Sequence, residues 1–304
     1  MRLACLDLGS NSLLLTVADW DGQSLQPIHE DVFLIRLSEN LHTGGKLHPA
    51  ARSRCLEALE SVRKTITNHG VDKVVAVATE ALRRASDSLA FIREIKNRFN
   101  LSFRIISPRA EARLTFKAIQ KEFSCIETDL VAFDVGGGST EIISGNTDTV
   151  SSVTTLDFGT VSSTEEFIGH DPILRVEMGE ATSWIRSRLE ALPAGSPSQT
   201  GIGVGGTVTT LKAVSLKMEP YDSSVIHGSS LSRSQVDDLL ELFLSMATGE
   251  RARLKGLPSQ RADIIPLGAV ITGAIMDRLN LGKILVSDRG LRWGILYDWI
   301  DRNG

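Results

Sequence analysis

The fold is decided by one stretch, which reads Leu130-Val131-Ala132-Phe133-Asp134-Val135-Gly136-Gly137-Gly138-Ser139-Thr140-Glu141. An apolar run of strand length meets a carboxylate, three glycines, two hydroxyl side chains and a second carboxylate. Glycine permits positive φ and close backbone approach, so consecutive N–H groups can turn toward one anion. Taken alone, the stretch is equally compatible with a glycine-rich hairpin turn whose final glutamate is solvated.

A second copy of this pattern begins at residue 7. The run Asp7-Leu8-Gly9-Ser10-Asn11-Ser12 aligns without gaps with residues 134–139, and Asp, Gly and Ser occupy the first, third and sixth places of both. Both copies follow four apolar residues and precede an extended run. Because the offset is close to half the chain, the repeat predicts two related halves, each with a strand–turn–strand loop that faces a shared cleft.

Composition excludes several classes of protein. The 304 residues are enough for two domains, and 42% hydrophobic with 23% charged residues is typical of globular chains. Aromatic residues make up only 5% and the net charge is -4, which argues against nucleic-acid binding. No apolar run approaches membrane-spanning length, and a charge follows Met1 too soon for a signal peptide. With three scattered cysteines and no Cys-x-x-Cys pair, we expect a cytoplasmic chain with reduced thiols.

Helical and extended patterns alternate after the first loop. We predict a helix over 49–69, a strand over 73–79, a helix from Glu80 to about Phe99, a strand over 103–107 and a helix from Pro108. A further glycine-rich strand-to-helix turn spans 203–207, and its helix would present N-terminal N–H groups to an anion. We place the domain boundaries so that residues 1–123 with 287–304 form the first domain and 124–286 the second.

Eight motifs, in order along nearly the whole chain, resemble those of the exopolyphosphatase/guanosine-pentaphosphate phosphohydrolase (Ppx/GppA) family within the actin-like superfamily. They are Asp7-Leu8-Gly9-Ser10-Asn11-Ser12, Thr79-Glu80-Ala81-Leu82-Arg83, Glu111-Ala112-Arg113-Leu114, Asp134 to Glu141, Gly203-Val204-Gly205-Gly206-Thr207, His227-Gly228, Arg261-Ala262-Asp263 and Ser287-Asp288-Arg289-Gly290-Leu291-Arg292. The resemblance implies an α/β fold of two related actin-like (ribonuclease H-like) domains, whose mixed five-stranded sheets flank a phosphate-binding cleft. It also implies a short, two-domain form without the helical C-terminal region of longer members.

The implied activity is a cytoplasmic hydrolase that releases terminal orthophosphate from inorganic polyphosphate, or the 5′ γ-phosphate of pppGpp, a nucleotide of the stringent response. Glu111 would activate the attacking water and Arg83 would pair with a phosphate. Mg²⁺ or another divalent cation would be held by Asp134, Glu141 and Asp7. Phosphates would be bound by Gly9, Ser10, Asn11, Ser12, Gly136, Gly137, Gly138, Ser139, Thr140, Gly205, Gly206, Thr207 and His227.

From the residues alone, the roles of two of these side chains are less specific. Glu111 is then more readily a solvated glutamate in the first turn of a helix, where it favours the helix dipole. His227 can contact a phosphate or simply hold its own loop, and we favour the loop. With the resemblance, domain closure is expected to bring Glu111 toward a phosphate held by residues 136–139.

The chain departs from the family pattern at three positions. Ala110 replaces a second glutamate before Ala-Arg, which leaves Glu111 as the sole candidate base. Leu14 replaces an arginine after Ser-Asn-Ser, so one phosphate contact is missing. Trp293 replaces the glutamate of the Gly-Leu-Arg-Glu-Gly ending, a position expected at the domain junction.

Two other functions fit the same motifs. A small-molecule kinase of the superfamily would use ATP and an acceptor, and a sensor of polyphosphate or nucleotides would bind without turnover. Retention of Glu111, Asp134 and Glu141 argues against the sensor. We expect no nucleic-acid or membrane partner, and a homodimer is compatible with the sequence.

Overall fold

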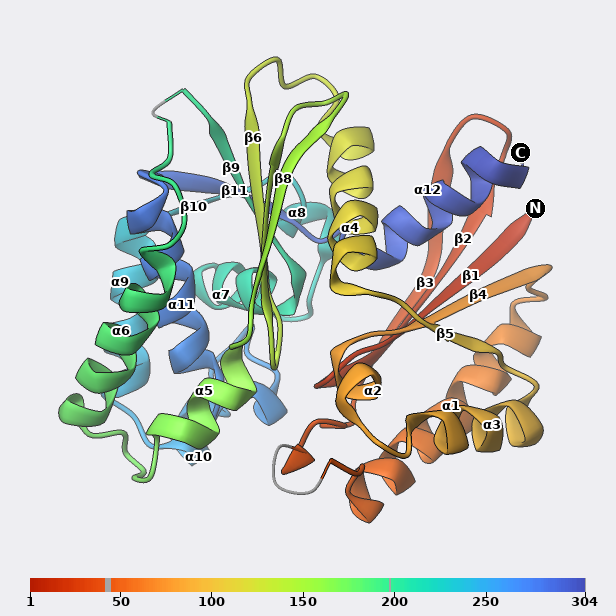
Figure 1. The fold of residues 1–304 in the computed structure, drawn as a ribbon, viewed down its shortest axis with the longest axis horizontal. Coiled ribbons are helices and arrows are strands. Elements are labelled where there is room, and N and C mark those ends of the chain that lie inside the picture. Colours follow the sequence, from red (N-terminus) through yellow and green to blue (C-terminus); the bar gives the residue numbers. More distant parts are fainter. Residues whose placement is uncertain (42–44, 197, 304) are drawn as a thin grey trace. The chain divides into compact units, whose positions relative to one another are not determined.

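The computed structural model describes residues 1–41, 45–196 and 198–303. The chain forms two compact units, one of residues 1–118 with 290–304 and the other of residues 119–289. Each unit is built around its own β-sheet (Figure 1). The domain boundaries expected from the sequence, after residue 123 and before residue 287, stay a prediction. None of the described helices combines the length and apolar character that crossing a membrane would require.

The first unit contains β1 (Arg2–Leu8), β2 (Ser12–Trp20), β3 (Leu25–Leu34), α1 (Pro49–Asn68), β4 (Lys73–Ala78), α2 (Glu80–Arg84), α3 (Ser88–Phe99), β5 (Phe103–Ile105), most of α4 (Pro108–Glu122) and α12 (Leu291–Asn303). Within the described residues its sheet has the five predicted strands, in the order β3-β2-β1-β4-β5. Strands β1, β2 and β3 form an antiparallel meander, whereas β4 and β5 run parallel to β1.

Both faces of this sheet are covered, because the side chains from Leu3 to Leu6 of β1 are all apolar and successive ones point to opposite faces. Ala4, Leu6 and Leu8 join an apolar cluster with residues of α1 and α3. Leu3 and Cys5 join a second cluster with residues of α12, which lies on the other side of the sheet (Figure 1). The strand that leads into the first glycine loop is therefore held from both sides.

Trp293 lies in this second cluster and is 2% exposed. We expected the position at the domain junction, but its side chain packs inside the first unit. The next residue also requires close packing, since a Cβ on Gly294 would lie 1.7 Å from the carbonyl oxygen of Leu114 in α4. Helix α12 thus packs tightly against α4.

The helix predicted from Glu80 to Phe99 is two helices, α2 and α3. The break lies at Ala85, whose backbone is extended (φ −70°, ψ 126°). Just beyond it, the Asp87 carboxylate accepts hydrogen bonds from the amide of Leu47 at 3.1 Å and from the guanidinium of Arg52 at 2.9 Å. These partners lie 40 and 35 positions earlier in the chain, so the local pattern could not reveal the break.

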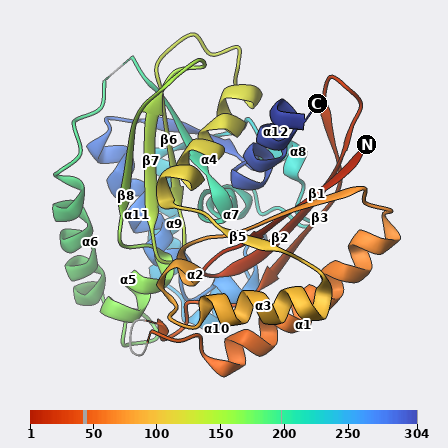
Figure 2. The same ribbon diagram turned by 45° about the vertical axis from the view of Figure 1, so that its right-hand side comes forward.

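The second unit contains β6 (Leu130–Val135), β7 (Thr140–Gly145), β8 (Val150–Leu156), α5 (Thr160–Phe167), α6 (Arg175–Leu189), β9 (Thr200–Val204), α7 (Gly205–Ser215), α8 (Ser223–Ile226), β10 (Ser230–Ser232), α9 (Arg233–Leu244), α10 (Thr248–Arg251), a 3₁₀ helix (Ser259–Arg261), α11 (Ile265–Arg278) and β11 (Lys283–Ser287). Its core joins side chains of β6 and β11 to those of α6, α7, α9 and α11. Figure 2 shows β6, β7 and β8 running side by side, and α5 follows the lower end of this meander.

The two sheets share one topology, which confirms the internal repeat. The order β3-β2-β1-β4-β5 corresponds to β8-β7-β6-β9-β11, and each sheet joins an antiparallel meander to two parallel strands. The prediction of five strands was wrong for the second sheet, which has six among the described residues. The extra strand, β10, pairs antiparallel with β11 at the edge, and three residues are too few to show an alternating pattern.

Candidate active site

The residues predicted for catalysis in the first unit follow the carboxyl ends of parallel strands. Leu8, Ala78 and Ile105 lie side by side in the register of β1, β4 and β5. The first glycine loop, helix α2 and helix α4 begin within three residues of these ends. Ligands of open α/β sheets bind at the carboxyl ends of the strands, so the topology places these predicted residues where a ligand would bind. The second sheet offers the same edge at β6, β9 and β11.

The two glycine loops close with the same hydrogen bond. In the first loop (residues 9–12) the amide of Gly9 donates to the carbonyl of Ser12 at 2.9 Å. In the second loop (residues 136–139) the amide of Gly136 donates to the carbonyl of Ser139, also at 2.9 Å. The sequence repeat is therefore a repeat of backbone geometry.

Helix α5 orients the second loop from behind. The amide of Thr160 donates to the carbonyl of Gly136 at 2.9 Å, and the amide of Val161 donates to that of Gly137 at 2.8 Å. In a trans peptide the C=O and the following N–H point in opposite directions, so the amides of Gly137 and Gly138 point away from α5. Within the residues that the structure describes, neither amide has an acceptor. The second loop thus presents two adjacent donors, as an anion cradle requires.

Gly159 makes this approach of α5 to the second loop feasible. A Cβ at this position would lie 2.4 Å from the carbonyl oxygen of Gly136 and 2.6 Å from the carbonyl carbon of Gly137. Its φ of −151° is open to any residue, so the requirement for glycine is one of space. No local pattern in the sequence marks Gly159, because the contact joins segments separated by β7 and β8.

Two threonines predicted to bind phosphate use their hydroxyl protons internally. The hydroxyl of Thr140 donates to the carbonyl of Phe158 at 2.8 Å, and that of Thr207 donates to the carbonyl of Val135 at 2.6 Å. Both side chains are buried. Their geometry ties the second loop to its neighbours and directs no hydroxyl proton outward.

The first loop is held by the segment after β3. The carbonyl of Ser10 accepts from the amide of Ser38 at 3.0 Å, and the carbonyl of Asn11 accepts from the amide of Ile35 at 2.9 Å. The amide of Asn11 consequently points away from that segment. Its side-chain oxygen is buried without a hydrogen-bond partner in the described part of the chain, a group that a ligand could satisfy.

Arg83 and Glu111, the predicted catalytic pair, are in direct contact. The Arg83 Nη1 donates to Glu111 Oε2 at 2.6 Å and to the carbonyl of Ile106 at 3.0 Å, and each side chain of the pair is 17% exposed. Burial raises the pKa of Glu111, Arg83 opposes this rise, and the negative charge of Glu80 adds to it. A carboxyl with a raised pKa is suited to accept a proton near neutral pH.

Glu80 is a site residue that sequence reasoning missed. Its carboxylate accepts a hydrogen bond from the Ser10 hydroxyl and another from Arg84 Nη1 at 2.8 Å. The signal in the sequence was a carboxylate placed directly after a strand that ends at the same edge as β1. The Ser10 hydroxyl, predicted to bind phosphate, donates its proton to Glu80.

Asp134 and Glu141, two of the predicted metal ligands, are cross-strand partners in β6 and β7. Such partners place their side chains close together on one face of the sheet. Among the described residues no group of three or more His, Cys, Asp or Glu side chains is arranged to hold a metal ion. Mg²⁺ often takes only one or two carboxylates together with phosphate oxygens, so this pair fits a cation that arrives with a phosphate ligand. Asp7, the third predicted ligand, belongs to the first unit.

The start of α7 contacts two charged side chains. Asp134 is in register with Val204, so its carboxylate lies against Gly205, where a Cβ would be 2.2 Å from Oδ1. A Cβ on Gly206 would be 2.5 Å from Nη2 of Arg261. A positive φ of 83° also favours glycine at position 205.

Arg261 belongs to the motif Arg261-Ala262-Asp263, but no role for its side chain follows from the sequence. Burial lowers its pKa, and Asp134 partly offsets this effect. No described carboxylate is within ion-pair distance of its guanidinium. Nearby, Arg251 donates from Nε to the carbonyl of Ala262 at 2.8 Å and so holds the segment that carries Arg261. A guanidinium beside a helix N-terminus is suited to a phosphate.

His227 lies in a separate cluster of the second unit. Its Nε2 is 3.6 Å from Glu122, its Nδ1 is 3.5 Å from the Ser287 hydroxyl, and its ring is 5.2 Å from that of Phe123. Glu122 also accepts from Arg289 at 2.6 Å. These contacts support the loop-holding role of His227, and its predicted role in phosphate binding stays a prediction.

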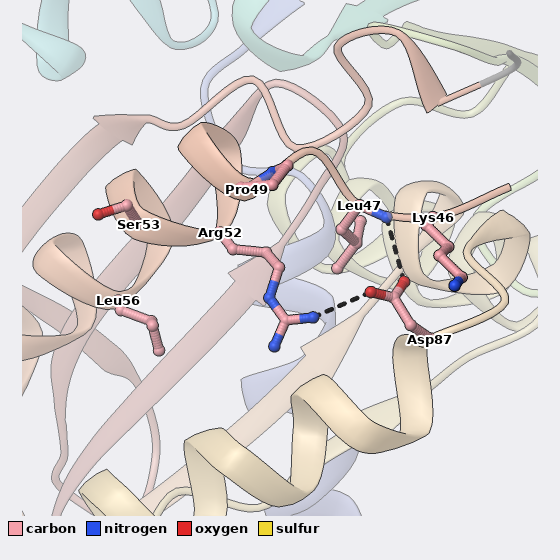
Figure 3. A pocket seen from close by; sticks show the side chains of 7 residues that line it. All are labelled: Lys46, Leu47, Pro49, Arg52, Ser53, Leu56 and Asp87. Atoms are coloured by element: carbon pink, nitrogen blue, oxygen red, sulfur yellow. Dashed lines mark hydrogen bonds and ion pairs between the residues drawn. The ribbon is translucent and has the colours of Figure 1, made fainter. Parts of the chain in front are cut away.

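A cavity of about 580 Å³ opens at the start of α1 (Figure 3). It is lined by Lys46, Leu47, Pro49, Arg52, Ser53, Leu56 and Asp87. The Arg52 guanidinium is paired with Asp87 at 2.9 Å and Glu94 at 2.5 Å, so its charge is compensated. None of the predicted site residues lines this cavity, and we assign it no function.

Known proteins resemble this chain over nearly its whole length. The pattern of the Ppx/GppA phosphatase family matches residues 16–303. "Exopolyphosphatase 2" of Mycobacterium tuberculosis is 30% identical over 97% of this chain and 97% of its own length. "Bifunctional 3-dehydroquinate synthase/phosphatase" of Fusobacterium nucleatum is 29% identical over 98% of this chain, which spans 46% of that protein.

Solved structures agree with the fold. The Ppx/GppA family member of Aquifex aeolicus is 31% identical, with a TM-score of 0.85, and the match covers 100% of this chain and 99% of that one. An exopolyphosphatase-like protein is 27% identical, with a TM-score of 0.89 over 98% and 97% of the two chains. These likenesses confirm the predicted α/β fold of two actin-like halves.

Proposed function

The chain belongs to the Ppx/GppA phosphatase family, and from this premise we propose that it is an exopolyphosphatase that releases terminal orthophosphate from inorganic polyphosphate. The observation that carries the proposal is the part-buried Arg83–Glu111 pair, in which a guanidinium suited to a phosphate contacts a carboxyl with a raised pKa. Relatives named exopolyphosphatase, of which one is 30% identical over almost its full length, support the choice of polyphosphate.

We assign activation of water to the first unit. Arg83 is the counter-ion of Glu111. A phosphate oxygen that binds Arg83 would compete for its N–H groups and release the carboxylate. Glu111 then accepts a proton from a water molecule, whose oxygen forms a bond to the terminal phosphorus. The anhydride P–O bond breaks, and its electron pair leaves with the shortened chain.

We assign most of the phosphate binding to the second unit. The amides of Gly137 and Gly138 and the N-terminal amides of α7 are donors for phosphate oxygens. The guanidinium of Arg261, beside Gly206, adds a positive charge. Asp134 and Glu141, with Asp7 as the further predicted ligand, would hold Mg²⁺, whose charge would offset the negative charge of the phosphate oxygens.

A pppGpp molecule carries the same kind of terminal phosphoanhydride, so we include it as a second substrate to be tested. A kinase would transfer the phosphate of ATP to an acceptor, and a sensor would bind without releasing phosphate. A cytoplasmic location and a homodimer stay predictions.

The test is release of orthophosphate from long polyphosphate, short polyphosphate, pppGpp and ATP, each with and without Mg²⁺. We expect the wild type to release phosphate from polyphosphate, Glu111→Gln to bind it with most turnover lost, and Glu127→Gln, at an exposed residue before β6, to act as wild type. Inertness of the wild type toward all four substrates would overturn the proposal. Near-normal turnover by Glu111→Gln would overturn the role of this residue.

A further inference from the structure

Glu80 is a buried carboxylate next to a site proposed for a polyanion, and the reaction outlined above does not use it. The residue is 8% exposed and follows β4 at the carboxyl edge of the first sheet. A negative charge there opposes binding of phosphate, and a buried carboxylate costs free energy unless it is paired. Its position therefore requires a physical explanation.

The contacts of Glu80 lead in two directions. One carboxylate oxygen accepts from the Ser10 hydroxyl in the first loop, and the other accepts from Arg84 at 2.8 Å. The Arg84 side chain is 46% exposed, whereas that of Glu80 is 11% exposed. The ion pair thus has one buried end at the first loop and one end that faces solvent.

The same carboxylate acts on Glu111. Among the described residues, the charged groups that act on Glu111 are Arg83 and Glu80, both on α2. Arg83 contacts Glu111 directly, while Glu80 acts through its charge and is itself balanced by Arg84. Helix α2 therefore supplies one member of the ion pair Arg83–Glu111 and both members of the ion pair Glu80–Arg84, and Glu80 also contacts the first loop.

We propose that Glu80 and Arg84 are a pair of positioning residues: Glu80 orients the first loop through Ser10 and, with Arg84 as its counter-ion, sets the electrostatic field in which Glu111 works. This rests on the proposed role of Glu111 as base. When a phosphate occupies Arg83, Glu111 loses the contact with its cation, and the negative charge of Glu80 helps to keep its affinity for a proton high. The structural alternative is that Glu80 only holds the chain at Ser10.

Three substitutions separate these roles. Glu80→Gln keeps an acceptor for Ser10 and removes the charge, Arg84→Gln keeps Glu80 and removes its counter-ion, and Glu80→Ala removes both charge and acceptor. Field effects predict opposite signs for the first two, whereas a role in packing alone predicts no change in proton affinity for either. Because the two Gln variants should shift the proton affinity of Glu111 in opposite directions, each variant serves as the control for the other.

The measurement is the titration of the Glu111 carboxyl, followed by ¹³C NMR in Glu-labelled protein and assigned with Glu111→Gln. We expect its midpoint to fall by about 0.5 to 1 pH unit in Glu80→Gln and to rise by a smaller amount in Arg84→Gln, whose charge is screened by solvent. The acidic limb of the pH dependence of kcat should move in the same directions. Glu80→Ala should lose more kcat than Glu80→Gln, because only Ala removes the acceptor for Ser10.

The inference is overturned if the Glu111 midpoint is unchanged in both Gln variants, or moves in the same direction in both. Because this titration needs no turnover, it still reports on Glu80 if the wild type proves inactive toward polyphosphate. In that case only the proposed function fails. If polyphosphate is hydrolysed but the midpoints do not move, only the assignment of Glu80 and Arg84 fails.

Discussion

Substitution of Gly159 by alanine tests how the second loop is built. Gly159 directly precedes α5, whose first amides hold the carbonyls of Gly136 and Gly137. The new Cβ would lie 2.4 Å from the Gly136 oxygen, about 1 Å inside the shortest ordinary contact of 3.4 Å. The three nearest atoms, which belong to Gly136 and Gly137, are all backbone atoms, so no side-chain rotation can relieve the overlap.

The structure sets the size of the expected effect. Overpacking of this kind costs about 1–3 kcal/mol of folding free energy. Relief requires α5 to move back, which lengthens its bonds to the loop and lets the amides of Gly137 and Gly138 turn. A shift of about 1 Å in catalytic geometry can cost about a hundredfold in rate. We expect the folding free energy of Gly159→Ala to be reduced by about 1–3 kcal/mol. We also expect this variant to lose most of its affinity for tripolyphosphate.

The assay combines urea unfolding, followed by tryptophan fluorescence, with calorimetric binding of tripolyphosphate. The control is Gly179→Ala in α6, where a Cβ meets nothing within 4 Å. It should be more stable by about 0.5–1 kcal/mol, since glycine is unfavourable inside a helix. Wild-type stability and affinity in Gly159→Ala would refute the account of the second loop.

Three further predictions follow from contacts elsewhere in the second unit. Arg261→Ala should weaken binding of tripolyphosphate, measured by calorimetry, by about tenfold or more, because a charge-assisted hydrogen bond is worth about 1.5–3 kcal/mol. The control, Arg63→Ala at an exposed position of α1, should leave the affinity unchanged. Arg251→Met should destabilise the fold by about 3 kcal/mol or more in urea, since two buried carbonyls and one part-buried carbonyl lose their donor. A variant of wild-type stability would contradict this. The pKa of Glu177 is lowered to about 2, chiefly by the hydrogen bond with His170. The ionised carboxylate therefore stabilises the folded state at pH values above its ordinary pKa of 4.5, and this stabilisation is lost as the pH falls toward 2. Glu177→Gln should therefore flatten the dependence of urea stability on pH in this range, and an unchanged slope would be evidence against the pairing.

Much of the fold could be predicted because its signals are local and occur twice. The runs around Asp7 and Asp134 each combine a buried strand with a glycine turn, and both loops have the same closing bond. What the sequence did not reveal depends on distant contacts. Ala85 breaks a helix because Asp87 binds residues of the preceding helix region, and β10 is too short to show a period.

The candidate site was predictable to the level of loops and not to that of individual hydrogen bonds. The hydroxyls of Thr140 and Thr207 have the right chemistry for phosphate, but the fold directs them to nearby carbonyls. Glu80 and Arg261 could be recognised only once the strand register placed them beside Ser10 and Gly206. In both cases the residue type was visible in the sequence, while its partner was set by tertiary structure.

The central claim is that water, placed by Glu111, attacks the terminal phosphorus of polyphosphate. Hydrolysis in H₂¹⁸O, with the products separated and read by mass spectrometry, tests this claim most directly. We expect each orthophosphate released in the first turnover to carry one ¹⁸O, the shortened chain to carry none, and Glu111→Gln to release far less of either product. Label in the shortened chain, or release of phosphate without label, would contradict it.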